Sequence, residues 1–256
     1  MKINKQYISI LLILLVVVII PFISEKKRLE TFQNQNKIEH IFWTGGYDST
    51  FRICQATIVE KKKVQPIYVT YNLDSKNDKD FWVRKNRKQE HETMDNVRKM
   101  INKKFPHTKD LLLPTITVDK DTPDPEYTKR FLKLNLWPFK RKIHQYEGLA
   151  RYAYNNKTYI DIGVLGWPRA HSKFMLFIRE HIINKDGNKY LNISKTNPMH
   201  YLRFPIFGMS KPDMCKYSKE HNFDEILSSS WSCWFPKSNK PCGKCPMCRE
   251  RFTCKK

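Results

Sequence analysis

Between residues 38 and 166 the chain alternates short apolar runs with longer amphipathic stretches. Each apolar run is rich in β-branched or aromatic residues and is bounded by Gly, Pro, Asn or Asp, the composition typical of strands. The runs predict four β-strands, at 41–43, 64–71, 111–118 and 159–166, the third of them split by Pro114.

The stretches between and after these runs predict helices. Apolar residues recur at helical spacing within 51–58, 78–104, 143–154, 174–183 and 210–221. Ser210 is expected to cap the last helix, with Pro212 in its first turn. From 119 to 139, three prolines interrupt any regular element, so this segment is interpreted as a lid or an insertion.

Strands that alternate with helices are typical of a parallel α/β sheet. Hydrophobic residues make up 40% of the chain, which is enough for a core, and 256 residues allow one large domain with small attachments. The sequence contains no internal repeat of a plausible period. We therefore expect residues 38–230 to form one Rossmann-like α/β domain.

The first 24 residues predict a membrane anchor. Residues 6–24 carry no charge, and at about 1.5 Å per helical residue they reach roughly 28 Å, close to the ~30 Å hydrocarbon thickness of a bilayer. A cleavable signal peptide is the alternative, but residues 21–25 offer no small-x-small cleavage site. Residues 25–37 are polar and aperiodic and are interpreted as a tether.

The turn between the first predicted strand and helix, Thr-Gly-Gly-Tyr-Asp-Ser at 44–49, has the composition of a phosphate site. Glycines let backbone N–H groups approach an anion, and Asp48 and Ser49 lie where the following helix presents its N–H groups and positive dipole end. The spacing fits neither a Walker loop nor Gly-x-Gly-x-x-Gly. An ordinary strand-turn-helix corner is the alternative.

Five of the seven cysteines lie in the last two dozen residues. Four of them have a Cys-x8-Cys-x2-Cys-x2-Cys spacing that suits thiolate ligands around one tetrahedral zinc ion: Cys233, Cys242, Cys245 and Cys248. Residues 231–256 are therefore expected to bind zinc. An iron–sulfur cluster with Cys254 as fourth ligand and a disulfide framework are the alternatives. Cys54 and Cys215 lie in helical apolar patterns and are interpreted as buried side chains outside any site.

The loop and the cysteine segment together resemble 7-cyano-7-deazaguanine synthase, a family of ATP pyrophosphatases. The family's pyrophosphate loop is Ser-Gly-Gly-x-Asp-Ser, in which Thr44 here replaces the first Ser. Near the C-terminus the resemblance rests on Ser-Lys at 210–211, Trp-Ser-Cys at 231–233 and Pro-Cys-Gly-Lys-Cys-Pro-Met-Cys-Arg at 241–249. It covers roughly residues 38–253.

The middle of the chain departs from the family pattern on the substrate side. The family's Tyr-Gly-Gln-Arg-His is matched only by Tyr71, with Gln89 and His91 displaced downstream, and its Gly-Arg-Asn is missing around His144. Trp-Pro-Arg-Ala at 167–170 stands where the family has Tyr-Pro-Asp-Cys-Arg. The resemblance therefore supports ATP binding better than it supports a deazaguanine substrate.

The resemblance implies a fold of the adenine-nucleotide alpha-hydrolase type and a carbon–nitrogen ligase of queuosine biosynthesis. Such an enzyme adenylates a carboxylate with ATP, and ammonia then gives an amide and, after a second activation, a nitrile. Asp48 would help to hold Mg²⁺, and Lys211 would reach the pyrophosphate, so Asp48, Ser49 and Lys211 are the expected catalytic residues. The expected ATP-binding residues are Thr44, Gly45, Gly46, Tyr47, Asp48, Ser49 and Tyr71.

Two other classes of function stay open. One is a membrane-anchored nucleotide-binding protein that has kept the fold but lost the reaction. The other is an enzyme with the same pyrophosphate loop (a PP-loop enzyme) that modifies tRNA. The net charge of +22 would attract a polyanion such as tRNA. Lys and Asn are common throughout the chain, however, so this charge is only weak support for a nucleic-acid partner.

The sequence also gives an expected topology. Basic residues flank the apolar segment almost equally, with Lys2 and Lys5 before it and Lys26, Lys27 and Arg28 after it. The positive-inside rule therefore favours a cytosolic C-terminal domain only slightly. An ATP-consuming site with cysteine thiolates favours the same side. We expect a membrane-anchored protein with its site in the cytosol.

Overall fold

The structure is a computed structural model of the chain, and it describes residues 38–70, 85–119, 122–136, 145–165, 173–185, 187–249, 251 and 254. The chain divides into two compact units, Met1–Ile38 and Glu39–Lys256, and the described residues belong almost entirely to the second. The predicted anchor, the tether and Tyr71 lie outside them. Over the described ranges, no helix combines the length and apolar character needed to cross a membrane.

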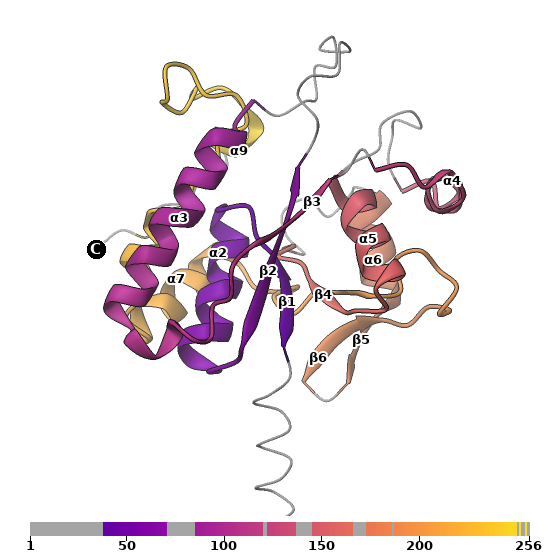
Figure 1. Ribbon diagram of the computed structural model, residues 1–256, viewed down its shortest axis with the longest axis horizontal. Helices are drawn as coiled ribbons and strands as arrows, with labels where there is room; N and C mark the ends of the chain where they lie inside the picture. The colour runs from indigo at the N-terminus through magenta and orange to yellow at the C-terminus, as the bar shows by residue number, and fades with distance from the viewer. Residues whose placement is uncertain are drawn as a thin grey trace, which may run out of the picture. The chain divides into compact units, whose positions relative to one another are not determined.

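Within the described residues, seven strands form one sheet in the order β3-β2-β1-β4-β7-β6-β5 (Figure 1). The strands are β1 (Glu39–Phe42), β2 (Val64–Thr70), β3 (Ile116–Asp119), β4 (Ile160–Asp161), β5 (Ile182–Lys185), β6 (Asn188–Leu191) and β7 (Leu202–Arg203). The strands from β3 to β7 in this order pair in parallel, whereas β6 is antiparallel to both β7 and β5. The predicted α/β sheet is confirmed, with an antiparallel hairpin added at one edge.

Helices cover both faces of this sheet (Figure 1). One face carries α2 (Tyr47–Cys54), α3 (Arg87–Lys104), α7 (Lys211–Glu220) and α8 (Asp224–Ser228). The other carries α4 (Pro125–Lys133), α5 (Gln145–Asn155) and α6 (Lys173–His181). Shorter elements are the π-helical turn Gln55–Val59 after α2, the 3-10 turn Pro106–Thr108 after α3, and α9 (Pro246–Arg249).

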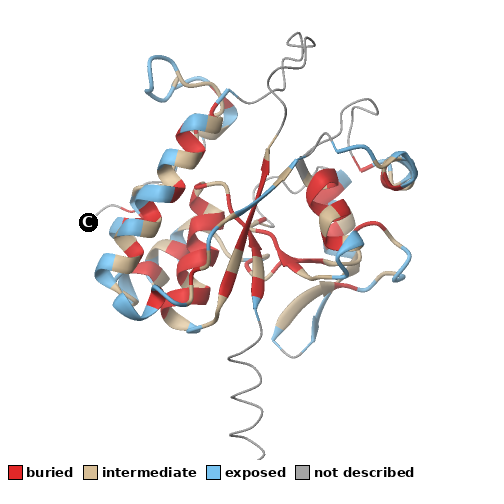
Figure 2. Ribbon diagram, in the orientation of Figure 1, coloured by how far each residue is buried: buried red, intermediate tan, exposed pale blue. Residues whose placement is uncertain are grey.

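Alternating side chains build a hydrophobic core on each face of the sheet. Along β1, Ile41 packs with α2 and α3, and the next residue, Phe42, packs with α5 and α6. Along β2, Tyr68 and Val69 divide in the same way, because successive side chains of a strand point to opposite faces. Figure 2 shows β1 and β2 as largely buried.

The segment 119–139 contains a helix that the prolines did not lead us to expect. Pro125 is the first residue of α4, a position where its missing N–H costs nothing. The Asp124 carboxylate caps the helix by accepting a hydrogen bond from the Tyr127 N–H at 3.0 Å. Tyr127 and Phe131 are both buried, so this part of the segment is packed against the domain.

The helix predicted at 174–183 ends earlier. It stops at His181, and Ile182 and Ile183 begin β5, because the chain turns back at Gly187 to pair with β6. Gly187 has a φ of 74°, a left-handed value that glycine adopts readily in turns. The β-branched pair therefore belongs to a hairpin, and the helical interpretation of these two residues is wrong.

Two predicted strands are shorter than expected. In the third, Leu112 forms only an isolated bridge with Val64, and regular pairing with β2 begins at Ile116, beyond Pro114. In the fourth, only Ile160 and Asp161 pair with neighbouring strands. The predicted helices at 143–154 and 210–221 correspond to α5 and α7.

Candidate functional site

The predicted phosphate loop lies where the sheet changes direction. From β1 the chain goes to β2 and β3 on one side, and later to β4 and β7 on the other, so β1 and β4 are neighbours at a switch point. In open α/β sheets, ligands bind beyond the carboxyl ends of the strands at such a point. Residues 44–49 follow β1 directly and lead into α2, which places them there.

Two glycines and a serine shape this loop. Gly45 has a φ of 69°, which glycine adopts without a Cβ penalty. Gly46 is the N-cap of α2, and no side chain among the described residues caps this helix start. Ser49 donates its hydroxyl to the Gly46 carbonyl at 3.2 Å, and its oxygen lies 3.4 Å from the Thr44 nitrogen, which donates to it. The turn leaves the helix start suited to an anion.

Gly163 brings the chain after β4 against the first turn of α2. A Cβ at this position would lie 2.9 Å from the Ser49 nitrogen and 3.1 Å from the Asp48 carbonyl oxygen, too close for a side chain to fit without a shift. Position 163 therefore completes the loop from the β4 side. A glycine inside an apolar run is its only signal in the sequence, and that signal indicates a bulge equally well.

The first turn of α3 supports the loop from the other side. A Cβ on Gly45 would lie 3.2 Å from both the Glu90 carbonyl oxygen and the Thr93 Cβ. The buried Glu90 carboxylate accepts hydrogen bonds from the Tyr68 hydroxyl at 2.7 Å and from the Asn86 amide at 3.0 Å. This network fixes α3 to β2 beside the loop, and it was not predicted because the bond that joins the two elements, Tyr68 to Glu90, spans 22 residues.

A buried ion-pair cluster fixes α2 to the sheet. Arg52 Nε on α2 lies 2.9 Å from Asp161 Oδ2 on β4, and Arg203 Nε on β7 lies 2.6 Å from Asp161 Oδ1. Arg203 also pairs with Glu39, and Arg52 with Glu60 at 2.7 Å. Burial by itself would raise the pKa of Glu39, but the neighbouring cations, Arg203 first, hold that pKa below its ordinary value.

Lys211 lies beside the phosphate loop. It is the first residue of α7, and its Nζ is 5.9 Å from the centre of the Tyr47 ring, within cation–π range. The helix start is held by the predicted Ser210 cap, because Ser210 and Asp213 exchange hydrogen bonds as a capping box. The structure thus places Lys211 against Tyr47 of the loop, while the catalytic roles of Lys211, Asp48 and Ser49 stay predictions.

The displaced family residues Gln89 and His91 both lie on α3. Gln89 is buried, and its amide donates to the Asn239 side chain at 3.0 Å. The His91 ring packs edge-on against Tyr68, with centroids 4.6 Å apart. Residues 166–172, which include the altered Trp-Pro-Arg-Ala, and residues 71–84 lie outside the described part.

The four predicted metal ligands come together. One Sγ from each of Cys233, Cys242, Cys245 and Cys248 lies within 4.8 Å of all the others, and the Cys242 and Cys248 sulfurs are 3.9 Å apart. Four thiolates around a zinc ion, with bonds of about 2.3 Å, would be separated by about 3.8 Å. A four-iron cluster is larger and would hold its thiolates farther apart. The geometry therefore fits one tetrahedral ion.

The thiols of this cluster differ in acidity. The N–H groups of Lys244 and Cys245 point at the Cys242 sulfur, 3.4 Å away, and lower its pKa to about 6. Burial raises the pKa of Cys233, and burial together with neighbouring cysteines raises that of Cys248 to about 12. A bound metal ion would be needed to keep all four as thiolates near neutral pH.

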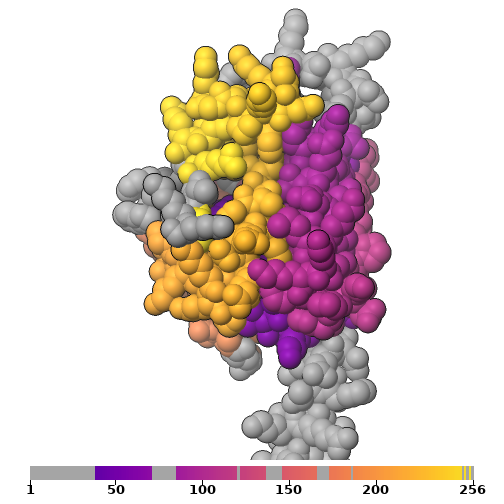
Figure 3. All heavy atoms as spheres, turned by 90° about the vertical axis from the view of Figure 1, so that its left-hand side faces the viewer, coloured from indigo at the N-terminus to yellow at the C-terminus, as the bar shows by residue number. Residues whose placement is uncertain are grey.

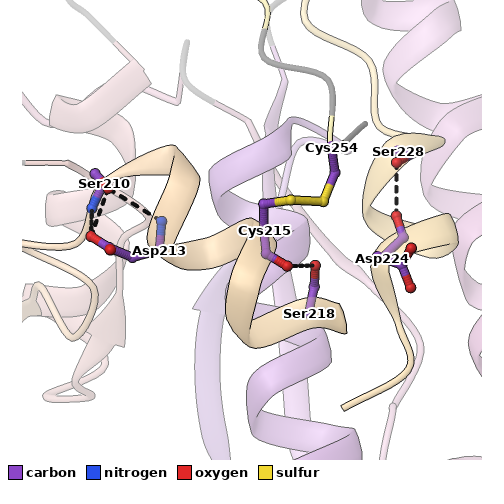
Figure 4. The surroundings of a disulfide bond; sticks show 7 residues. All are labelled: Ser210, Asp213, Cys215, Ser218, Asp224, Ser228 and Cys254. Atoms are coloured by element: carbon purple, nitrogen blue, oxygen red, sulfur yellow. Dashed lines mark hydrogen bonds between the residues drawn. A yellow bond between two sulfur atoms is a disulfide. The ribbon is translucent and has the colours of Figure 1, made fainter. Parts of the chain in front are cut away.

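Cys215 and Cys254 form a disulfide, with Cα atoms 5.5 Å apart (Figure 4). The interpretation of Cys215 as a buried side chain outside any site is therefore wrong: Cys215 is half-buried and bonded to Cys254, and a local apolar pattern cannot reveal a partner 39 residues away. Cys54 is fully buried in the core, as predicted. Because Cys254 is bonded to Cys215, it is not available as the fourth ligand of an iron–sulfur cluster.

A glycine loop at a switch point of the sheet and four clustered cysteines, all on one α/β domain, are the arrangement expected of a PP-loop protein that binds a metal ion. Residues 166–254 match the family model described as "Queuosine biosynthesis protein QueC". The matched part contains α7 and all four candidate ligands, so the resemblance to 7-cyano-7-deazaguanine synthase is confirmed there. It indicates an ATP-dependent enzyme. The loop at 44–49 lies outside the matched residues.

Other comparisons add little. A crystal structure described as a predicted subunit of tRNA methyltransferase from Methanocaldococcus jannaschii aligns with 72% of this chain and 74% of its own. The identity is 14% and the TM-score is 0.35, so this similarity carries no argument about function. No curated protein sequence matches the chain.

Proposed function

We propose that this protein is an ATP-dependent carbon–nitrogen ligase that adenylates a carboxylate and passes it to ammonia. The observation that carries the proposal is the start of α2, where the N-cap Gly46 has no side chain and Gly163 packs directly against Ser49. Backbone N–H groups at a helix start, with no Cβ in the way, are suited to phosphate oxygens. Lys211 supplies a cation beside the same loop.

In this proposal the loop holds the pyrophosphate leaving group. A substrate carboxylate oxygen attacks the α-phosphorus of ATP, the bond to the β-phosphate oxygen breaks, and pyrophosphate leaves. Mg²⁺, when bound, would neutralise charge on the phosphates, with the Asp48 carboxylate as its protein ligand. The protein supplies positioning and electrostatic stabilisation, which need no covalent nucleophile.

The resemblance suggests the later steps. Ammonia would displace AMP from the acyl-adenylate to give an amide, and a second ATP would activate the amide oxygen so that loss of AMP leaves a nitrile. A bound zinc ion would have a structural role, because all four of its coordination positions are filled by the cysteines of the cluster.

Pyrophosphate release tests the proposed reaction. The protein is incubated with ATP and Mg²⁺ alone, with added 7-carboxy-7-deazaguanine and ammonia, or with added bulk tRNA. We expect stimulation by the deazapurine and loss of turnover in Asp48→Asn. The exposed Asp110→Asn serves as the matched control, since it removes the same charge away from the loop.

The outcomes separate the alternatives. Stimulation by tRNA alone would assign a PP-loop tRNA-modifying enzyme, for which the net charge of +22 is weak support. ATP binding without pyrophosphate release under any condition would leave a binding protein that has lost the reaction.

We also propose that residues 6–24 anchor the protein in a membrane with the ATP site in the cytosol. The Cys215–Cys254 disulfide argues against that side, since stable disulfides are rare in the cytosol. Two sequons provide the test, because Asn156 and Asn192 are both exposed. Expression in a eukaryotic host should give no glycan on either asparagine, and a glycan would reverse the assignment.

A further inference from the structure

One residue contacts both the phosphate loop and the cysteine cluster. The Trp231 backbone N–H donates to the Gly45 carbonyl at 2.9 Å. The indole Nε1–H of the same residue donates to the Cys233 carbonyl at 2.7 Å. Trp231 therefore joins the central peptide of the loop to the first candidate metal ligand.

The contact to Gly45 determines where a neighbouring N–H points. The Gly45 carbonyl and the Gly46 N–H belong to the same planar trans peptide, so they point in opposite directions. When Trp231 holds the carbonyl on one side, the Gly46 N–H is directed to the other. Gly45 has a left-handed φ of 69°, and the Trp231 bond holds its carbonyl in that conformation.

The cysteine segment also contacts the other wall of the loop. The Lys85 N–H donates to the Trp234 carbonyl at 3.0 Å, and the Gln89 amide donates to Asn239 at 3.0 Å. These bonds hold the segment against the first turn of α3, whose Glu90 carbonyl packs on Gly45. In Figure 3, the orange and yellow C-terminal residues lie along the magenta α3 on one face.

From this geometry we propose that Trp231 is a positioning residue that couples the four-cysteine metal site to the phosphate loop. A metal ion fixes Cys233, the Cys233 carbonyl fixes the indole, and the Trp231 N–H orients the Gly45–Gly46 peptide for phosphate. The inference rests on the proposed function, since it assumes that ATP binds at 44–49. Coupling of this kind is reciprocal, so bound ATP also raises the affinity of the cysteine cluster for the metal ion.

Two affinities measure the coupling. The dissociation constant of ATP is measured by titration calorimetry with metal-loaded protein, and that of the metal by titration of Co²⁺, whose thiolate absorption reports the cysteine site. Each is measured with and without the other ligand. One neutral hydrogen bond changes an equilibrium constant about fivefold, so ATP should tighten Co²⁺ binding to the wild type by about that factor.

Trp231→Phe tests the residue itself. It keeps an aromatic ring and the backbone N–H but removes the indole N–H. We expect ATP affinity to fall about fivefold at full metal occupancy, and the mutual effect of ATP and Co²⁺ to disappear. Trp234→Phe is the matched control, because it removes an indole N–H three residues away and keeps the carbonyl that accepts from Lys85; it should retain the coupling.

A purely structural role would lower stability without removing the coupling, and that result overturns the inference. Should Trp231→Phe fail to fold, partial metal removal from the wild type by a chelator replaces it. ATP affinity must then fall with metal content while circular dichroism retains the α/β signal, and an unchanged affinity again overturns the inference. A fully metal-loaded wild type that binds no ATP would instead reject the proposed function.

Discussion

Gly163 and Ser49 are held so close that a Cβ on residue 163 would lie 2.9 Å from the Ser49 nitrogen. The contact joins the end of β4 to the first turn of α2, across the point where the sheet changes direction. Because backbone cannot give way as a flexible side chain can, any substitution at 163 must displace the helix start. The position of the proposed phosphate site thus depends on a glycine outside the loop itself.

Gly163→Ala should therefore impair ATP binding more than stability. Inserting a methyl group into a packed contact costs about 1–3 kcal/mol of stability, whereas moving the N–H groups of α2 removes the phosphate geometry, so we expect at least tenfold weaker ATP binding. Thr158→Ala, before β4, is the control and should bind ATP normally. Calorimetry and thermal unfolding measure the two effects. Unchanged ATP affinity in Gly163→Ala would contradict the site.

Substitutions of the two loop glycines should have different effects, one on nucleotide binding and the other on folding stability. Gly46 has a φ of −72°, which other residues adopt, so Gly46→Val should fold while its branched side chain blocks the nucleotide. Gly45 has a φ of 69°, so Gly45→Ala should lose about 1 kcal/mol or more of folding stability. Urea unfolding and ATP titration of both variants distinguish the two effects. Nucleotide binding by Gly46→Val at wild-type affinity would exclude the loop as the phosphate site.

The buried ion pairs predict loss of stability in acid. Glu39 has a pKa below its ordinary value of 4.5 in the folded protein, so the unfolded chain binds the proton more readily. Its contribution is present above pH 4.5 and is lost as the pH falls through the folded pKa. Urea unfolding from pH 6 downward should show this loss, and Glu39→Gln should reduce the pH dependence while lowering stability at pH 6.

The exposed Glu126→Gln is the control for that series and should keep the wild-type pH dependence. An identical acid slope in Glu39→Gln and the wild type would show that the Arg203 pair does not control it.

The cysteine site predicts one zinc ion per chain. Structural zinc contributes on the order of 10 kcal/mol to folding in small sites, so Cys245→Ser should leave the C-terminal segment disordered or the protein insoluble. Cys254→Ser is the control, because Cys254 lies in the disulfide and not in the cluster. Metal analysis should give full zinc for Cys254→Ser. Iron with sulfide in the wild type would disprove the zinc assignment.

Local signals were enough to predict the candidate loop, the cysteine cluster and the helix cap. The Gly-Gly-x-Asp-Ser loop lies within six residues, three of the cluster cysteines share two short spacings, and Ser210 caps a helix that starts at the next residue. In each case the interacting groups are neighbours in sequence, or nearly so, and their spacing alone limits the geometry.

Features that depend on distant contacts were not predictable in the same way. Gly163, Trp231 and the Cys215–Cys254 bond each act on a residue many positions away, and only the packed sheet brings the partners together. The Ile182–Ile183 pair fits a helix by periodicity, but the following turn and its partner strand make it a hairpin.

The disulfide gives a stability prediction that is independent of the metal. Cys215 and Cys254 are separated by 39 residues, and a cross-link of this span restricts the unfolded chain by about 4 kcal/mol in the loop-entropy model, with measured values typically 2–4 kcal/mol. Cys254→Ser should therefore unfold at lower denaturant concentration than the oxidised wild type. In reducing agent the two proteins should unfold alike, because the wild type then lacks the bond as well. Zinc content is measured in every sample, so that metal loss is not mistaken for disulfide reduction. Equal stability of variant and wild type under oxidising conditions, or two free thiols found by peptide mapping, would refute the cross-link.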